Sequence, residues 1–146
     1  SAHLHLLSRR IRSPRWLPKA HLQLRIRSSL TQLASSKVER GEIWTVASGS
    51  GYAGKPRPVV IIQDDRYDAT DSITICPLTS IKLPTPLFRI PIARGESTGL
   101  ETESYAMVDK ITTVSRSKLG ALLGRVGDEQ LVAIDRAIVV FLGIAD

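Results

Sequence analysis

Two short segments of the chain combine the residue types that phosphate chemistry needs. The first, 54–58, reads Gly-Lys-Pro-Arg-Pro and holds Arg57 between two prolines. Each proline fixes its own φ, and Pro58 also pushes Arg57 toward extended backbone, so the guanidinium stands on a stiff support. A planar, permanently charged guanidinium matches two phosphate oxygens at once. From the residues alone, Arg57 is either a phosphate-binding group or an exposed arginine in a rigid turn.

The second segment, 76–80, reads Cys-Pro-Leu-Thr-Ser and ends an apolar run with two hydroxyl groups. The hydroxyls of Thr79 and Ser80 are candidates for donating hydrogen bonds to a bound oxyanion. The alternative is that they only cap a turn, since Thr and Ser often do so at the ends of strands.

The loop before Arg57 supplies three further candidates. Tyr52 is a candidate for stacking a nucleobase, and Lys55 for holding a neighbouring phosphate. Gly54 permits a tight turn or a close backbone approach. The alternative for the tyrosine and the lysine is that both are ordinary exposed loop side chains.

Several kinds of chemistry are excluded by composition. All three histidines lie before residue 22, and Cys76 is the single cysteine. Residues 38–146 therefore hold neither a histidine acid–base pair nor a Ser–His triad. A zinc site is not expected either, and no nucleotide-binding glycine motif is present. We expect no metal and no cofactor. The acid pairs Asp64/Asp65 and Glu101/Glu103 lie in predicted loops, and we interpret them as solvated turn carboxylates.

Charge divides the chain near residue 37. Residues 1–37 carry eight basic side chains and no acid, whereas residues 38–146 carry 12 basic and 14 acidic side chains, a net charge of −2. We therefore predict a basic, poorly ordered N-terminal arm (1–37) and one folded domain (38–146). A transit peptide, a nucleic-acid-binding tail and translated upstream sequence are all consistent with the arm. No apolar run approaches the roughly 20 residues that cross a bilayer, so no membrane association is expected.

The pattern of residues 38–146 predicts five or six short strands followed by one helix. Arg57–Gln63 is almost continuously apolar and β-branched, which favours a strand buried on both faces. Pro91 within Leu87–Ala93 indicates an edge strand or a bulge. The other predicted strands are Gly41–Ala47, Ser72–Leu78, Ser104–Val114 and Ala121–Val126.

The last segment changes to helical spacing, with Asp128 as the expected N-cap and Gly143 as the stop. A mainly β fold that closes with one helix predicts a small, strongly curved, SH3-like barrel.

Taken together, the motifs resemble the MazF/PemK family of toxins from toxin–antitoxin systems. The matching segments are ERGEIW at 39–44, GKPRPVVIIQDD at 54–65, CPLTS at 76–80, MVDKI at 107–111 and LGRV at 123–126. Their order and spacing also agree. The resemblance covers about 109 residues and none of the arm.

The resemblance implies a sequence-specific, metal-independent endoribonuclease that cleaves single-stranded RNA, often mRNA. It further implies a homodimer in the bacterial cytoplasm that a cognate antitoxin protein holds inactive. The family's catalytic arginine matches Arg57, and its hydroxyl residue matches Thr79, with Ser80 beside it. One position departs from the pattern: several members carry a glutamate five residues before the arginine, and this chain has Tyr52 there. The resemblance therefore names no general base.

Two other functions stay open at the level of sequence. A gyrase-poisoning toxin of the CcdB type would share the barrel but act by clamping a protein. Phe141-Leu142-Gly143-Ile144 is a faint echo of that family's C-terminal end, without its tryptophan. A catalytically inactive, RNA-binding barrel is the second alternative, which the missing glutamate and the near-neutral domain favour.

Overall fold

The computed structural model describes residues 37–47, 55–84 and 87–146. The chain divides at Lys37/Val38, and the unit Val38–Asp146 is the one described below. Residues 1–36 of the predicted arm, Tyr52 and Gly54 lie outside the described residues. No helix in the described ranges is long and apolar enough to span a membrane.

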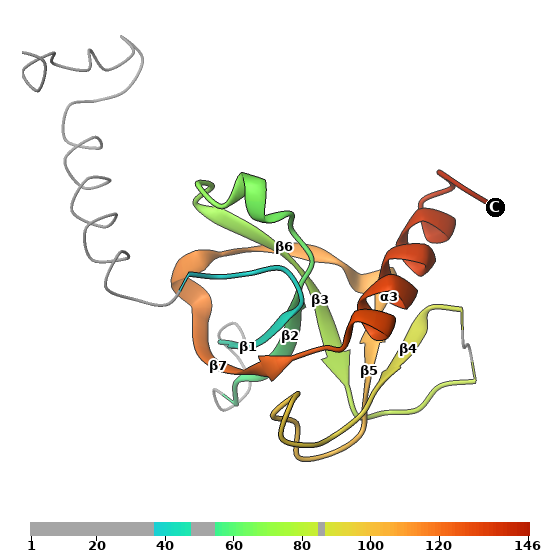
Figure 1. Cartoon of the computed structure of the whole chain (residues 1–146), viewed down its shortest axis with the longest axis horizontal. Helices are drawn as coiled ribbons and strands as arrows, with labels where there is room; N and C mark the ends of the chain where they lie inside the picture. Colours follow the sequence, from blue (N-terminus) through green and yellow to red (C-terminus); the bar gives the residue numbers. More distant parts are fainter. Residues whose placement is uncertain (1–36, 48–54, 85–86) are drawn as a thin grey trace, which may run out of the picture. The chain divides into compact units, whose positions relative to one another are not determined.

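Seven strands form a curved, mainly antiparallel sheet that one helix covers (Figure 1). Their order is β4-β5-β3-β2-β1-β7, and β6 pairs with β3 beyond the end of β5. The strands are β1 (Glu42–Val46), β2 (Arg57–Ile61), β3 (Ser72–Thr79), β4 (Arg89–Ile92), β5 (Ser104–Met107), β6 (Thr112–Ser115) and β7 (Leu119–Arg125). The 3-10 helices are η1 (Asp65–Tyr67), η2 (Val108–Lys110) and η3 (Arg116–Lys118), and the C-terminal helix is α3 (Asp128–Phe141). The predicted curved β fold with a closing helix is confirmed, although the sheet is not closed by hydrogen bonds between its end strands.

The central strands are buried on both faces because their apolar residues are nearly continuous. Val59, Val60 and Ile61 of β2 are at most 3% exposed. Alternate residues join two separate clusters. Ile43, Val60 and Cys76 belong to the cluster that includes Ile134 of α3. The second cluster lies on the opposite face and consists of Trp44, Val46, Val59, Ile61, Ile73 and Ile75.

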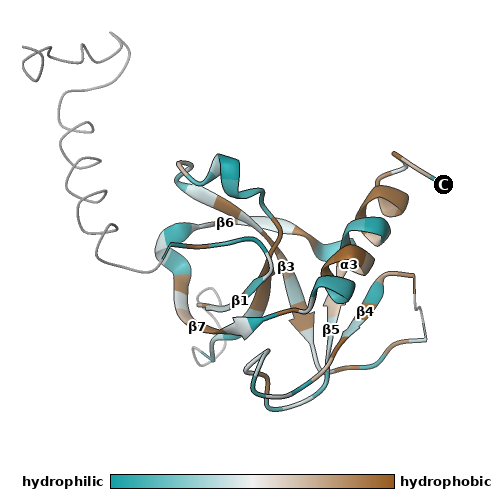
Figure 2. Cartoon of the chain, in the orientation of Figure 1, coloured by the Kyte–Doolittle hydropathy of each residue, from teal (hydrophilic) through white to brown (hydrophobic). Residues whose placement is uncertain are grey.

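Helix α3 covers the first cluster with residues three or four positions apart. Ile134 is fully buried, and Leu131, Ala137 and Ile138 pack beside it. The ring of Phe141 contacts Phe88 edge-on, with 5.2 Å between centroids. Figure 2 shows hydrophobic and hydrophilic positions alternating along this helix, as this packing requires.

The structure corrects two expected details and confirms two others. Ser104–Val114 is not one strand, because η2 interrupts it and turns Val108 into the core, so the strands number seven. The N-cap of α3 is Gly127, and Asp128 is the first helical residue. Pro91 does lie on an edge strand, since β4 ends the sheet order, and Gly143 follows the helix with φ +73°.

Candidate functional site

The two predicted site segments meet at the same end of neighbouring strands. Strands β2 and β3 are antiparallel, with Val59 opposite Pro77 and Val60 opposite Cys76. The paired stretch ends at Val59 and Pro77, and Arg57 at the start of β2 and Thr79 at the end of β3 each lie two residues beyond that point. The register therefore brings the guanidinium and the hydroxyl that sequence analysis singled out to the same end of two adjacent strands.

Prolines explain why the two strands part at this point. Pro58 and Pro77 lack the N–H groups that would extend the ladder. The β2–β3 pairing accordingly ends at Val59 and Pro77. Arg57 and Thr79 therefore lie where β2 and β3 are no longer paired, at the edge of the second core cluster.

Arg57 is exposed and, within the part of the chain that the structure describes, has no carboxylate partner. Its neighbours across β1 and β2 are apolar, since it pairs with Val46. Five other arginines form ion pairs, namely Arg40, Arg66, Arg89, Arg116 and Arg125. The contrast leaves the guanidinium of Arg57 open to an anion from solution.

The Thr79 side chain is half-buried and oriented by one hydrogen bond. Its Oγ1 accepts from the Ile81 backbone N–H at 3.2 Å. Because this contact uses an oxygen lone pair, the hydroxyl proton stays available for donation. Ser80 and Lys55 are exposed beside this pair, so the structure brings four predicted site residues into one neighbourhood.

Tyr105 is an aromatic side chain at this site that sequence analysis did not select. It pairs with Thr79 across β3 and β5, and with Pro91 across β5 and β4. Thr79, Tyr105 and Pro91 therefore form one row across three strands, and Arg57 lies at the adjacent end of the neighbouring strand β2. In the sequence, the only signal for Tyr105 is the alternation of residues along β5. This alternation does not identify the neighbouring strands with which Tyr105 pairs.

Several other titratable groups of the domain have structural roles. Burial raises the pKa of the Cys76 thiol to about 12, and the Asp109 carboxylate adds to this effect. Hydrogen bonds from Arg66 hold the pKa of Asp64 below its ordinary value, and the Asp64 carboxylate also caps η1. Asp65 accepts from the Arg40 backbone N–H at 2.7 Å. The first acid pair thus organises a turn, as expected. In the described ranges, no group of three or more His, Cys, Asp or Glu side chains is arranged to hold a metal.

Solved toxin structures share this mainly β fold with its C-terminal helix. A MazE–MazF structure from Deinococcus radiodurans has a TM-score of 0.64 at 18% identity, covering 75% of this chain and 100% of that one. A mycobacterial endoribonuclease in complex with its cognate antitoxin has a TM-score of 0.61 at 24% identity, covering 75% and 98%. These likenesses show the fold.

Residues 39–142 match the family described as the PemK-like, MazF-like toxin of type II toxin–antitoxin systems. A protein of Mycolicibacterium smegmatis named probable endoribonuclease MazF is 52% identical over 108 residues, covering 74% of this chain and 99% of that protein. Endoribonuclease MazF9 of Mycobacterium tuberculosis is 31% identical over 117 residues, covering 73% and 98%. The chain therefore belongs to the PemK-like, MazF-like toxin family. This membership confirms the predicted family and favours the nuclease over the gyrase poison.

Proposed function

We propose that this chain is a toxin that cleaves single-stranded RNA without a metal ion, using Arg57 and Thr79. The observation that supports the proposal is the β2–β3 register, which brings the start of β2, with the exposed Arg57, and the end of β3, with a Thr79 hydroxyl that is free to donate, to the same end of two adjacent strands. Family membership and the names of the two relatives support the reaction class.

In this reaction the ribose 2′-oxygen attacks the adjacent phosphorus while the bond from phosphorus to the 5′-oxygen breaks. The 2′-hydroxyl proton passes to solvent, and the departing 5′-oxygen takes a proton. The products are a 2′,3′-cyclic phosphate and a 5′-hydroxyl. DNA is not a substrate, because it lacks the attacking group.

Each side chain has a distinct part in this step. Arg57 neutralises the negative charge that grows on the non-bridging oxygens, and Thr79 donates its hydroxyl proton to one of them. Ser80 and Lys55 hold the flanking backbone. The guanidinium acts as a fixed positive charge and hydrogen-bond donor throughout.

The decisive experiment incubates the full chain with a long RNA, with and without EDTA, and maps the fragment ends. We expect fragments with 5′-hydroxyl ends and no effect of EDTA. Fragments with 5′-phosphates, or activity that EDTA abolishes, would contradict the mechanism. Gyrase-dependent DNA breaks without RNA cleavage would instead support the clamping alternative.

A cognate antitoxin is the proposed protein partner, and bacterial cytoplasm is the proposed location. Solved relatives include toxins in complex with their antitoxins. A second copy is also proposed as a partner, because α3 presents Val132, Val140 and Phe141 with at least 42% of each exposed. Sedimentation should give twice the 16.0 kDa mass of one chain. A monomeric mass at micromolar concentration would contradict the dimer.

A further inference from the structure

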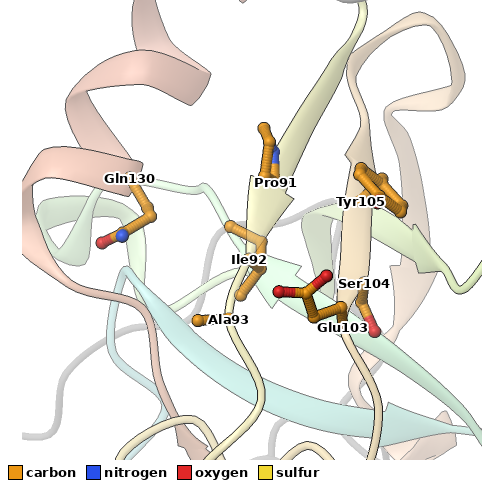
Figure 3. Close-up of a pocket in the computed structure, with 7 residues that line it drawn as sticks. All are labelled: Pro91, Ile92, Ala93, Glu103, Ser104, Tyr105 and Gln130. Carbon is orange, nitrogen blue, oxygen red and sulfur yellow. The ribbon is translucent and has the colours of Figure 1, made fainter. Parts of the chain in front are cut away.

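A small pocket lies beside the catalytic row, between β4, β5 and α3. It measures about 160 Å³, less than the roughly 300–1,000 Å³ of sites that enclose a drug-sized ligand. A single planar ring system is therefore a better match than a whole nucleotide. The lining residues are Pro91, Ile92, Ala93, Glu103, Ser104, Tyr105 and Gln130 (Figure 3).

The register connects this pocket to the proposed reaction centre. Tyr105 lines the pocket and is the direct cross-strand partner of Thr79. A base that stacks on the Tyr105 ring would therefore belong to a nucleotide next to the scissile linkage. Such stacking is available to every base and confers affinity without selectivity.

Glu103 supplies the selective group. Figure 3 shows its side chain extending toward Ile92 and Ala93, with Tyr105 two residues further along β5. Among the described residues, nothing donates a hydrogen bond to this carboxylate. An ionised carboxylate only accepts hydrogen bonds, through two oxygens side by side. It also repels phosphate, so the group that it receives must be a base edge.

Among the four RNA bases, guanine alone presents two adjacent donors, N1–H and N2–H, on its Watson–Crick edge. Adenine and cytosine pair one donor with a ring nitrogen acceptor, and uracil places its N3–H between two carbonyl oxygens. A charge-assisted, bidentate contact to the carboxylate therefore favours guanine and disfavours uracil most.

Hydrogen bonds and close packing fix the backbone of the loop that leads into β5, while the Glu103 side chain itself is exposed. The Thr98 hydroxyl donates to the Ala93 carbonyl at 2.8 Å, and the Arg125 backbone N–H donates to the Ser97 carbonyl at 2.8 Å. Gly99, at φ +70°, packs so closely on β7 that a Cβ would lie 2.0 Å from the Leu123 carbonyl oxygen. Because this backbone is already ordered, a ligand that binds beside it loses less conformational entropy.

We propose that the Glu103–Tyr105 pocket selects a guanine adjacent to the cleaved linkage. This inference rests on the proposed ribonuclease function and adds a specificity-determining residue to it. Sequence analysis interpreted Glu103 as a solvated turn carboxylate, a role that Glu101 retains, since Glu101 is exposed and does not line the pocket.

The test compares Glu103→Gln with the matched control Glu101→Gln. A random-sequence RNA pool is cleaved by each full-length protein, and the fragment ends are sequenced. Wild type and Glu101→Gln should favour guanine over uracil at one flanking position by about tenfold or more, whereas Glu103→Gln should lose that preference and keep the others. An unchanged preference profile in Glu103→Gln would overturn the proposal.

A binding measurement separates failure of this inference from failure of the catalytic proposal. Fluorescein-labelled octauridine, with or without one internal guanosine, is titrated with the Arg57→Ala variant, and anisotropy gives Kd. We expect tighter binding of the guanosine probe, abolished by adding Glu103→Gln. Tyr105→Leu should weaken binding of both probes about tenfold, and Tyr105→Phe should not. Equal affinity for the two probes would overturn the pocket whether or not RNA is cleaved.

Discussion

Two arginines of this domain, Arg57 and Arg89, show how the same side chain serves opposite purposes. Arg57 is exposed at a proline-bounded strand end and has no carboxylate partner among the described residues. Arg89 is 8% exposed, and its guanidinium is paired with Asp109 next to the core. Its Nε has no hydrogen-bond partner among the described residues, so burial costs this side chain part of its hydrogen-bonding capacity.

The comparison shows that two properties distinguish a reactive arginine from a structural one: exposure to solvent and the absence of a carboxylate partner. A buried arginine with a carboxylate partner is already neutralised, and losing one member of the pair leaves the other without its counter-charge. An exposed arginine on a stiff backbone contributes little to folding but meets an incoming anion without reorganisation. Substitutions at the two positions should therefore separate activity from stability.

The largest effect is expected for Arg57→Ala. Removing one donor to the developing oxyanion should lower kcat/KM for RNA cleavage by about 100- to 1,000-fold, with no change in the urea midpoint of unfolding. The matched control is Arg136→Ala, which removes an exposed arginine from α3 and should leave both quantities unchanged. Full activity of the Arg57→Ala variant would contradict the assignment of Arg57 as the reactive arginine.

Arg89→Met should have the reverse profile. Removing the buried guanidinium leaves Asp109, whose side chain is 30% exposed, without its counter-charge, and we expect the free energy of unfolding to fall by about 2 kcal/mol. Urea denaturation at fixed protein concentration measures this loss. Adding Asp109→Leu should restore part of it, because an apolar pair no longer leaves a charge buried. A loss below about 1 kcal/mol in the single variant would show that the pair is not structural.

Thr79→Val tests whether the hydroxyl at the same strand end as Arg57 acts in the reaction. Loss of one hydrogen bond to a charged phosphate oxygen corresponds to a fall of about 10- to 100-fold in kcat/KM. Thr79→Ser keeps the hydroxyl and should retain most of the activity, so the pair of variants separates the donor from the methyl group. Equal activity of Thr79→Val and wild type would assign the residue to the Ile81 turn alone.

Cys76 lies beside the structural pair and gives the smallest effect. Its pKa rises to about 12 in the folded protein, against about 8.5 in an unfolded chain. The stabilising contribution is complete below pH 8.5 and is lost as pH rises toward 12, so the unfolding free energy should fall by about 1 kcal/mol between pH 9 and 10. Cys76→Ala should remove that part of the slope. Identical slopes in the two proteins would contradict the assignment.

Local sequence patterns predicted most of the strands and the helix. They did not predict which segments, distant in the sequence, pair or pack together. The continuous apolar run of β2 indicated burial on both faces, and Pro91 indicated an edge strand, because each depends on a single strand's own chemistry. The break at η2 was missed because Val108 is apolar like its neighbours in the two strands. Its turn toward the core is set by packing against α3.

The same limit applied to the candidate site. The spacing of the prolines indicated Arg57, and the two adjacent hydroxyl residues indicated Thr79. That both lie at the same end of adjacent strands depends on the β2–β3 register, which no local spacing encodes. Glu103 looked like an ordinary loop carboxylate because its neighbours come from β4 and α3. Tyr52 and Gly54 stay predictions, since both lie outside the described residues.

Arg57, Thr79 and Tyr105 lie on three neighbouring strands, β2, β3 and β5, and the spacing of these strands sets the length of a ligand that can touch all three side chains. Neighbouring strands are about 4.8 Å apart, so this row of side chains spans two gaps, or about 10 Å. A polymer that touches all three side chains must cross the strands rather than follow them. The Arg57 cation lies at one end of this row and the Glu103 carboxylate near the other, so a polymer that crosses the strands in one direction binds with a different free energy from one that crosses in the opposite direction. The sheet therefore limits both the length and the chain direction of the RNA segment that it can bind.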